Sequence, residues 1–264
     1  MSIALAVVLT LAAYTDVLLV GAVIVITQIM VAAAPSPANA SGHSVNAPRF
    51  GAAALAGLIA TGVTLHPEVL FGADGTRAGR VGTIESGVFA GLVPAVAAGV
   101  IVALVSQMLR KDGRKSLVLT TGYAVTLCTF AALAIGWIGA AQSIGGAPVV
   151  AVGAIALAAG LLVWLVPFDR WIIASLAVAA GGAGGALAAP YLGDTSGMTW
   201  AFGALVGIGV AMFGILGQVL GRAWCSGRRH ASAGWGFPGA LSLALSAPIV
   251  FVASQLLGAS FTLS

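Results

Sequence analysis

Basic side chains gather near the C-terminal end of this chain, directly after an apolar, glycine-rich segment. Residues 214–230 contain Arg222, Arg228, Arg229 and His230, and they contain no acidic residue. Guanidinium groups bind phosphate oxygens in a bidentate manner. Together with Arg170, these side chains form a candidate pocket for a phosphate or an anionic lipid headgroup. The alternative is that they flank helix ends and fix membrane topology without a specific ligand.

The sequence lacks the residue patterns that would indicate other chemistry. Its Cys and His residues have no zinc spacing, no glycine-rich loop ends in Lys-Ser or Lys-Thr, and no serine occupies a Gly-x-Ser-x-Gly elbow. A magnesium ion that activates a nucleotide usually needs one or two carboxylates. The loops that carry most of the basic residues offer only Asp112 and Asp169. We therefore expect no cofactor and no metal, with Mg²⁺ required only if the chain is an enzyme.

Asp16 is the carboxylate that lies deepest within an apolar run. A charge at such a position costs about 2.5 to 3.5 kcal/mol on insertion scales, so it should face protein or water. Asp16 is therefore a candidate intramembrane polar site for an ion or a headgroup. Because Tyr14 and Thr15 precede it, the alternative is a polar residue at a break in the helix.

The elements that must position these residues are transmembrane helices. Of the 264 residues 60% are hydrophobic and 7% charged, with a mean hydropathy of +1.09, so a water-soluble surface cannot cover the chain. Apolar runs of about 20 residues recur along it. We predict an all-α polytopic membrane protein with a single domain, residues 1–264, in which N-terminal helices (1–140) precede a second helical unit (141–264).

About eight spans are predicted, and the first apolar run is longer than one crossing requires. It should either tilt or break near Asp16 into a re-entrant piece and a span. The first five predicted spans cover residues 3–34, 50–65, 86–109, 117–140 and 149–166. The sixth begins within 167–171 and ends at 189, and the last two cover 200–221 and 238–258.

Basic residues predict the orientation of these spans. If the loop from Arg110 to Lys115 is cytoplasmic, strict alternation places nine of the eleven Lys and Arg residues inside, and only Arg77 and Arg80 outside. This arrangement predicts a multi-pass protein of the cell membrane with both termini outside. The partners expected from such a charge distribution are membrane lipids and not nucleic acid.

Pairs of glycines four residues apart predict close helix packing in the C-terminal half. The pairs are Gly181 with Gly185, Gly203 with Gly207, and Gly217 with Gly221. Such faces let helix backbones approach closely. We interpret them as packing faces within the chain; the alternative is that they bind a second copy or another membrane protein.

Three C-terminal segments resemble the phosphatidate cytidylyltransferase (CDP-diacylglycerol synthase) family. Pro167 and Trp171, before a Gly/Ala-rich helix, match the family's Ser-Pro-Lys-Lys-Thr-Trp-Glu-Gly region, and Ala247-Pro248 matches its last helix. Gly214 and Leu216 match the family's Gly-Asp-Leu-x-Glu-Ser segment. The two lysines and the glutamate of the first motif are not matched. In the second segment Ile215 replaces Asp, Gln218 replaces Glu, Val219 replaces Ser, Arg222 and Arg228 replace Lys, and Arg229 replaces Asp.

This resemblance implies a family-like helical membrane protein that has lost the metal-binding acids and, with them, nucleotidyl transfer. It would keep a cytoplasmic basic pocket of Arg170, Arg222, Arg228, Arg229 and His230 for anionic phospholipid headgroups. One alternative is an active cytidylyltransferase whose rearranged metal site uses Asp169 or Asp112. Another is a small transporter or a subunit of a membrane complex.

Overall fold

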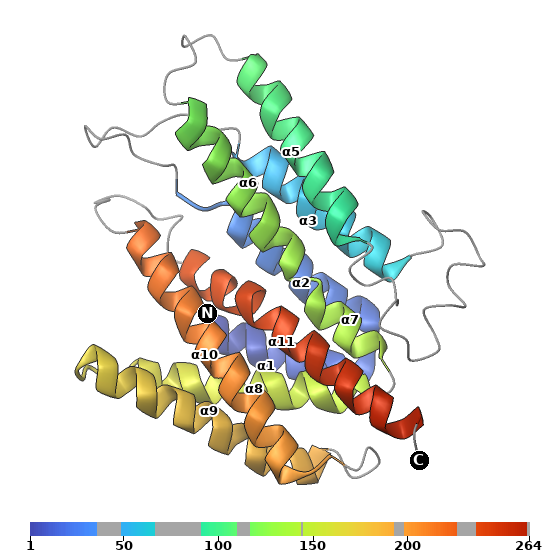
Figure 1. Ribbon diagram of the computed structural model, residues 1–264, viewed down its shortest axis with the longest axis vertical. Helices are drawn as coiled ribbons and strands as arrows, with labels where there is room; N and C mark the ends of the chain where they lie inside the picture. The colour runs from blue at the N-terminus through green and yellow to red at the C-terminus, as the bar shows by residue number, and fades with distance from the viewer. Residues whose placement is uncertain are drawn as a thin grey trace.

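The computed structural model describes residues 1–35, 49–66, 91–109, 117–143, 145–192, 198–225 and 236–262, and every regular element in these ranges is an α-helix. The predicted all-α fold is thereby confirmed, and Figure 1 shows the helices gathered into one elongated bundle. The helices are α1 (Ser2–Thr15), α2 (Val17–Ala32), α3 (Arg49–Leu65), α5 (Leu92–Met108), α6 (Leu117–Leu133), α7 (Gly136–Gln142), α8 (Gly146–Trp164), α9 (Arg170–Leu192), α10 (Trp200–Cys225) and α11 (Phe237–Thr262).

Five segments are long and apolar enough to cross a membrane. The first is α6 and α7 taken together, and the others are α8, α9, α10 and residues Phe237–Gly258 of α11. The helices α1, α2, α3 and α5 are apolar but shorter. Predicted spans four to eight therefore correspond to long helices, whereas the total of eight crossings stays a prediction.

Charge is confined to helix ends in the part of the chain that the structure describes. Asp, Glu, Lys and Arg occur there at five positions, which are Asp16, Arg49, Asp169, Arg170 and Arg222. The exterior is apolar instead, with Trp171, Leu187 and Tyr191 of α9 exposed by 85%, 69% and 83%. An uncharged helical surface of this kind suits contact with lipid chains, so the chain is a multi-pass helical membrane protein.

The first apolar run breaks at Asp16. The helix α1 ends at Thr15, α2 begins at Val17, and Asp16 between them has extended backbone angles (φ −157°, ψ 138°). Its carboxylate accepts the Leu18 N–H at 3.0 Å and so caps α2. The predicted break in this run is confirmed, whereas its division into a re-entrant piece and a full span stays a prediction.

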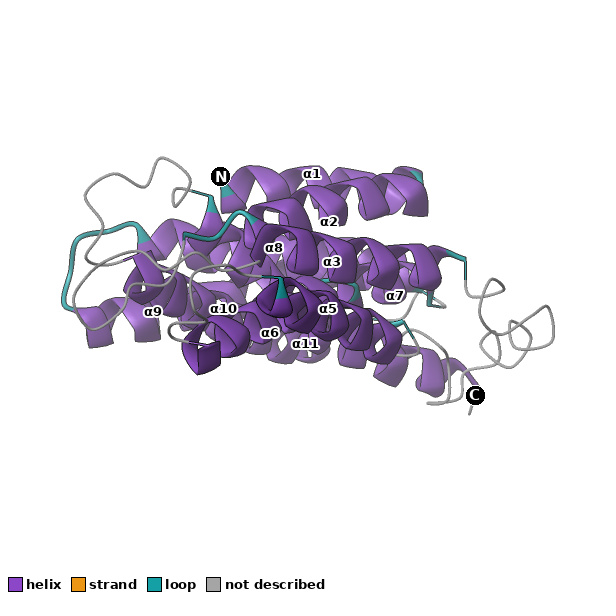
Figure 2. Ribbon diagram, turned by 90° about the horizontal axis from the view of Figure 1, so that it is seen from above, coloured by secondary structure: helices purple, strands orange, loops and turns teal. Residues whose placement is uncertain are grey.

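The two helices on either side of the break form an antiparallel hairpin. At the start of α1, the Ser2 hydroxyl accepts a hydrogen bond from the Gln218 amide of α10 at 3.3 Å. At the end of α2, Met30 lies against Gly236, just before α11. Both outer ends of the hairpin therefore lie where α10 ends and α11 begins, and Figure 2 shows the two helices side by side.

This hairpin changes the relation between the two chain ends. The start of α1 lies beside the last turns of α10, whereas α11 ends at the other end of the bundle (Figure 2). Crossings along the bundle axis would place the two termini on opposite sides of a membrane. The predicted orientation with both termini outside counts the first apolar run as one crossing, and it stays a prediction.

The helices pack in two groups with α11 between them. One group contains α2, α3, α5 and α6, and the other contains α1, α8, α9 and α10; α11 contacts members of both (Figure 1). The two halves of the hairpin thus belong to different groups, because α1 packs on α8 while α2 packs on α3.

Glycines bring α9 and α10 into backbone contact. A Cβ at Gly185 would overlap the Gly203 carbonyl oxygen, and a Cβ at Gly207 would overlap that of Gly181. The third pair, Gly217 and Gly221, faces Ser242 and Pro238 of α11. The interpretation of these faces as packing surfaces within the chain is confirmed.

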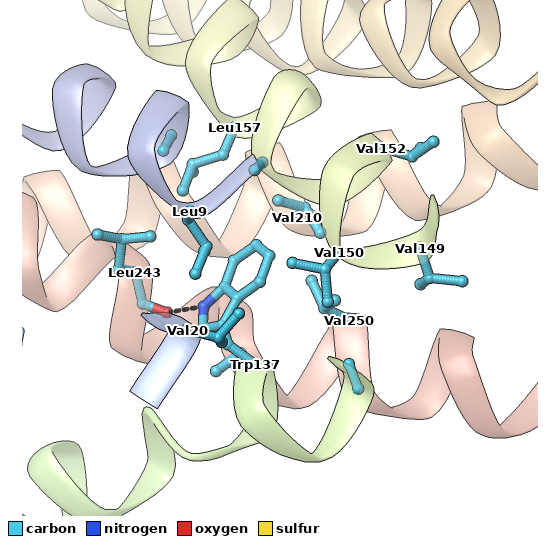
Figure 3. Packing of buried hydrophobic residues seen from close by; sticks show 14 of the residues in the cluster. Leu9, Val20, Trp137, Val149, Val150, Val152, Leu157, Val210, Leu243 and Val250 are labelled. Carbon is cyan, nitrogen blue, oxygen red and sulfur yellow. Dashed lines mark hydrogen bonds between the residues drawn. The ribbon is translucent and has the colours of Figure 1, made fainter. Parts of the chain in front are cut away.

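The largest buried cluster surrounds Trp137 of α7. Figure 3 shows its ring among Leu9, Val20, Val150 and Val250, which come from α1, α2, α8 and α11. The indole N–H donates to the Leu243 carbonyl oxygen at 2.9 Å. Helices of both groups are therefore joined through one buried side chain.

Candidate functional site

The described arginines lie at one end of the bundle, which we call the basic end. There α3 begins at Arg49, α9 begins at Arg170, and α10 ends one turn after Arg222. The side chains of Arg170 and Arg222 are exposed. Of the five candidate pocket residues, the structure places Arg170 and Arg222, which lie at the ends of the neighbouring helices α9 and α10. The other three, Arg228, Arg229 and His230, lie outside the described residues.

Arg222 lies over the ring of Trp164, the last residue of α8. Its guanidinium carbon is 5.9 Å from the ring centroid, within the range of a cation–π interaction. The Trp164 indole nitrogen is buried and has no hydrogen-bond partner among the described residues. The sequence does not single out Trp164, because a tryptophan at a helix end is typical of an interface anchor.

The last turn of α10 is held in place by an aromatic cluster. Trp224 packs on Tyr123 with ring centroids 4.8 Å apart and on Phe237 at 5.8 Å. Its indole N–H donates to the Tyr123 hydroxyl at 2.8 Å, and that hydroxyl donates in turn to the Pro35 carbonyl oxygen. Because these contacts join α6, α10, α11 and the end of α2, they fix the helix that carries Arg222.

Two residues in the positions where the resembling family has acids are buried in α10. Gln218 is 8% exposed and its amide donates to Ser2, while Ile215 is 7% exposed. Gln218 therefore joins α10 to the start of the hairpin. Neither position faces solvent at the basic end.

Asp169 caps the start of α9. Its carboxylate accepts the Trp171 N–H at 3.0 Å, a usual role for Asp at a helix N-terminus. Asp112 lies outside the described residues. The described ranges contain no group of three or more His, Cys, Asp or Glu side chains that could hold a metal ion, and one capping carboxylate does not make a Mg²⁺ site.

Asp16 lies at the tip of the α1–α2 hairpin, at the end of the bundle opposite the basic end. Its side chain is exposed, and so are Tyr14 and Thr15. The role that the structure gives it is the cap on α2, which agrees with the alternative interpretation of a polar residue at a helix break. Binding of an ion or headgroup by Asp16 stays a prediction.

Gln28 of α2 is among the largest fully buried side chains of the described residues, and the sequence does not single it out. It is 1% exposed, its amide donates to the Ala131 carbonyl oxygen of α6 at 3.1 Å, and its own oxygen accepts the Thr61 hydroxyl of α3 at 3.0 Å. A Cβ at Gly57 would lie 2.9 Å from the Gln28 side chain, so a residue without a side chain makes room for the amide. The only sequence signal for this network is an amide within an apolar run.

Gln28 compensates for a break in the predicted fourth span. The helix α6 ends at Leu133 and α7 begins at Gly136. At the break the Ile135 N–H bonds to the Ala132 carbonyl at 3.2 Å, so the Ala131 carbonyl loses its usual helical donor and receives the Gln28 amide instead. Broken helices in transporters expose such carbonyls to ions, whereas here the carbonyl is already paired.

Comparisons of this chain with protein-family models, with curated proteins and with solved structures return no match. The apolar helices and the confinement of charge to helix ends define the class, a multi-pass helical membrane protein. Any narrower assignment depends on the residues at the basic end.

Proposed function

We propose that this chain is a multi-pass protein of the cell membrane that binds anionic phospholipid headgroups at its basic end and does not transfer nucleotides. The observation that carries the proposal is the charge difference between the two ends of the bundle. Nine basic residues lie at the basic end or in segments that connect helix ends located there: Arg49, Arg110, Lys111, Arg114, Lys115, Arg170, Arg222, Arg228 and Arg229.

The acidic residues are distributed in the opposite way. Asp112 and Asp169 are the acids of the basic end and its connecting segments, which gives nine basic less two acidic residues, a net charge of +7. The rest of the chain has two basic and five acidic residues, a net charge of −3. Basic residues beside helix ends attract anionic headgroups by about 1 kcal/mol each near a charged membrane surface.

The same asymmetry supports an orientation. Under the positive-inside rule the basic end faces the cytoplasm. With the hairpin described above, the start of α1 then lies on the cytoplasmic side and α11 ends on the outside. The anionic lipids of the inner leaflet are the ligands within reach of Arg170 and Arg222.

The proposal is tested by the thermal stability of the detergent-solubilised protein with added lipid. A ligand that binds only the folded state at ten times its Kd stabilises it by about 1.4 kcal/mol. We expect phosphatidylglycerol to raise the unfolding temperature and phosphatidylcholine, at the same concentration, to change it less. Arg222→Gln should reduce the difference between the two lipids. Equal shifts from both lipids would remove the case for recognition of anionic headgroups.

A further inference from the structure

We propose that Trp164 and Arg222 together bind one phosphate group, with the indole N–H and the guanidinium donating hydrogen bonds to its oxygens. The inference rests on the proposed function, because it names the side chains that hold the phosphate of the headgroup. The ligand chemistry is an anionic phosphate oxygen, supplied by a phospholipid or by free phosphate.

The first observation is the unpaired indole N–H of Trp164. Other enclosed tryptophans in the described ranges have acceptors: Trp137 donates to the Leu243 carbonyl at 2.9 Å, and Trp224 to the Tyr123 hydroxyl at 2.8 Å. The Trp164 nitrogen is also buried, yet has no partner among the described residues. Buried polar groups are nearly always paired in folded proteins, so an acceptor from outside the chain would complete this site.

The second observation is the positive charge over the face of the Trp164 ring. Arg222 lies 5.9 Å from the Trp164 ring centroid, and its side chain is exposed. Of the two acids in the described ranges, Asp16 lies at the opposite end of the bundle and Asp169 caps α9. The guanidinium therefore keeps its hydrogen-bond donors for a ligand, and arginine to phosphate is among the strongest charge-assisted pairs in proteins.

A purely structural role for Arg222 explains only part of this geometry. The helix α8 ends at Trp164, and a cation near a helix C-terminus interacts favourably with the helix dipole. That role accounts for the position of the guanidinium over the ring. It leaves the buried indole N–H without an acceptor, which a bound phosphate oxygen would provide.

The site lies at the level expected for headgroups. Trp164 and Arg222 both lie within the last turn of their helices at the basic end. Trp171, next to Arg170, is 85% exposed at the same end, as is typical of an indole at a membrane interface. Because Arg222 is exposed on a long flexible stem, it can move aside to admit a phosphate to the enclosed nitrogen.

The test follows the indole N–H signals of ¹⁵N-tryptophan-labelled full-length protein by NMR in detergent micelles. The Trp164 signal is assigned by its loss in Trp164→Phe. Dihexanoyl-phosphatidylglycerol and inorganic phosphate are titrated separately. We expect the Trp164 signal to shift and saturate with the lipid, and Arg222→Gln to weaken that binding by about tenfold or more. Trp164→Phe, which keeps an aromatic ring but has no Trp164 signal, should weaken the binding by about 2- to 10-fold, read from the lipid-induced rise in unfolding temperature.

Trp171→Phe is the matched control, because it removes an exposed indole at the same end, and we expect it to leave the affinity unchanged.

A saturable shift with the lipid alone assigns the site to a phospholipid, and a shift with inorganic phosphate as well assigns it to phosphate from either source. A Trp164 signal that neither ligand moves overturns the site. If phosphatidylglycerol still stabilises that protein against heat, the lipid-binding function stands without this site; if it does not, both proposals fall.

Discussion

Replacement of Gln28 by methionine should destabilise the folded bundle, because it removes both hydrogen bonds of the buried amide at nearly constant side-chain volume. The Ala131 carbonyl would lose its donor at the α6 break, and the Thr61 hydroxyl would lose its acceptor. Interhelical hydrogen bonds in a membrane protein average about 0.6 kcal/mol and reach about 1.7 kcal/mol. Gln28→Met should therefore lower the free energy of unfolding by about 1 to 3 kcal/mol.

The measurement is equilibrium unfolding in mixed micelles of dodecyl maltoside and dodecyl sulfate, followed by circular dichroism. Thr61→Val removes one of the two bonds and should cost about 0.6 kcal/mol. The double variant should show a coupling energy of similar size, because both substitutions remove the same bond. Thr27→Val is the matched control, since the buried Thr27 hydroxyl donates only to the Val23 carbonyl of its own helix, at 3.0 Å. Wild-type stability in Gln28→Met, or a coupling energy of zero, would refute the role given to this network.

Three further predictions concern packing, capping and catalysis. Gly185→Ala should destabilise the protein by about 1 to 3 kcal/mol in the same assay, because its Cβ overlaps the Gly203 carbonyl. The control is Gly122→Ala, whose Cβ would have nothing within 4 Å and which should cost no stability. Equal effects of the two substitutions would contradict the close approach of α9 and α10. Asp16→Ala should lose about 0.5 to 2 kcal/mol of capping energy, and Asp16→Asn clearly less; equal losses would show that the cap is not its role. Purified protein given CTP and phosphatidate should form no CDP-diacylglycerol, and product formation that is lost in Asp169→Asn would establish the active enzyme instead.

The helical class followed from the sequence because composition alone decides it. Apolar runs of about 20 residues cross lipid as helices, which satisfy their own backbone groups, and predicted spans four to eight correspond to long helices. The break at Asp16 was one of two arrangements that the sequence allowed. In the structure Asp16 caps α2 at the break, and α1 packs on α8, a contact between helices far apart in the sequence that local patterns do not predict.

The interior of the bundle was the least predictable part. Gln28 meets Ala131 across 103 positions of the chain, and its role exists only because α6 breaks nearby. Trp164 and Arg222 likewise meet through the packing of α8 and α10, so neither residue alone indicates the pair. The prediction that Arg170 and Arg222 lie at one end succeeded more easily, because alternation of spans fixes the end at which each residue lies.

The central claim, that the basic end binds an anionic phospholipid, is tested most directly by native mass spectrometry of the detergent-extracted protein. We predict that the wild-type chain retains an anionic phospholipid, and that the triple variant Arg222→Gln, Arg228→Ala, Arg229→Ala reduces its occupancy by about tenfold or more. The matched control, Arg77→Ala with Arg80→Ala, removes the two basic residues outside the basic end and should retain the lipid. Retention of the same lipid at wild-type occupancy by the triple variant would contradict the claim.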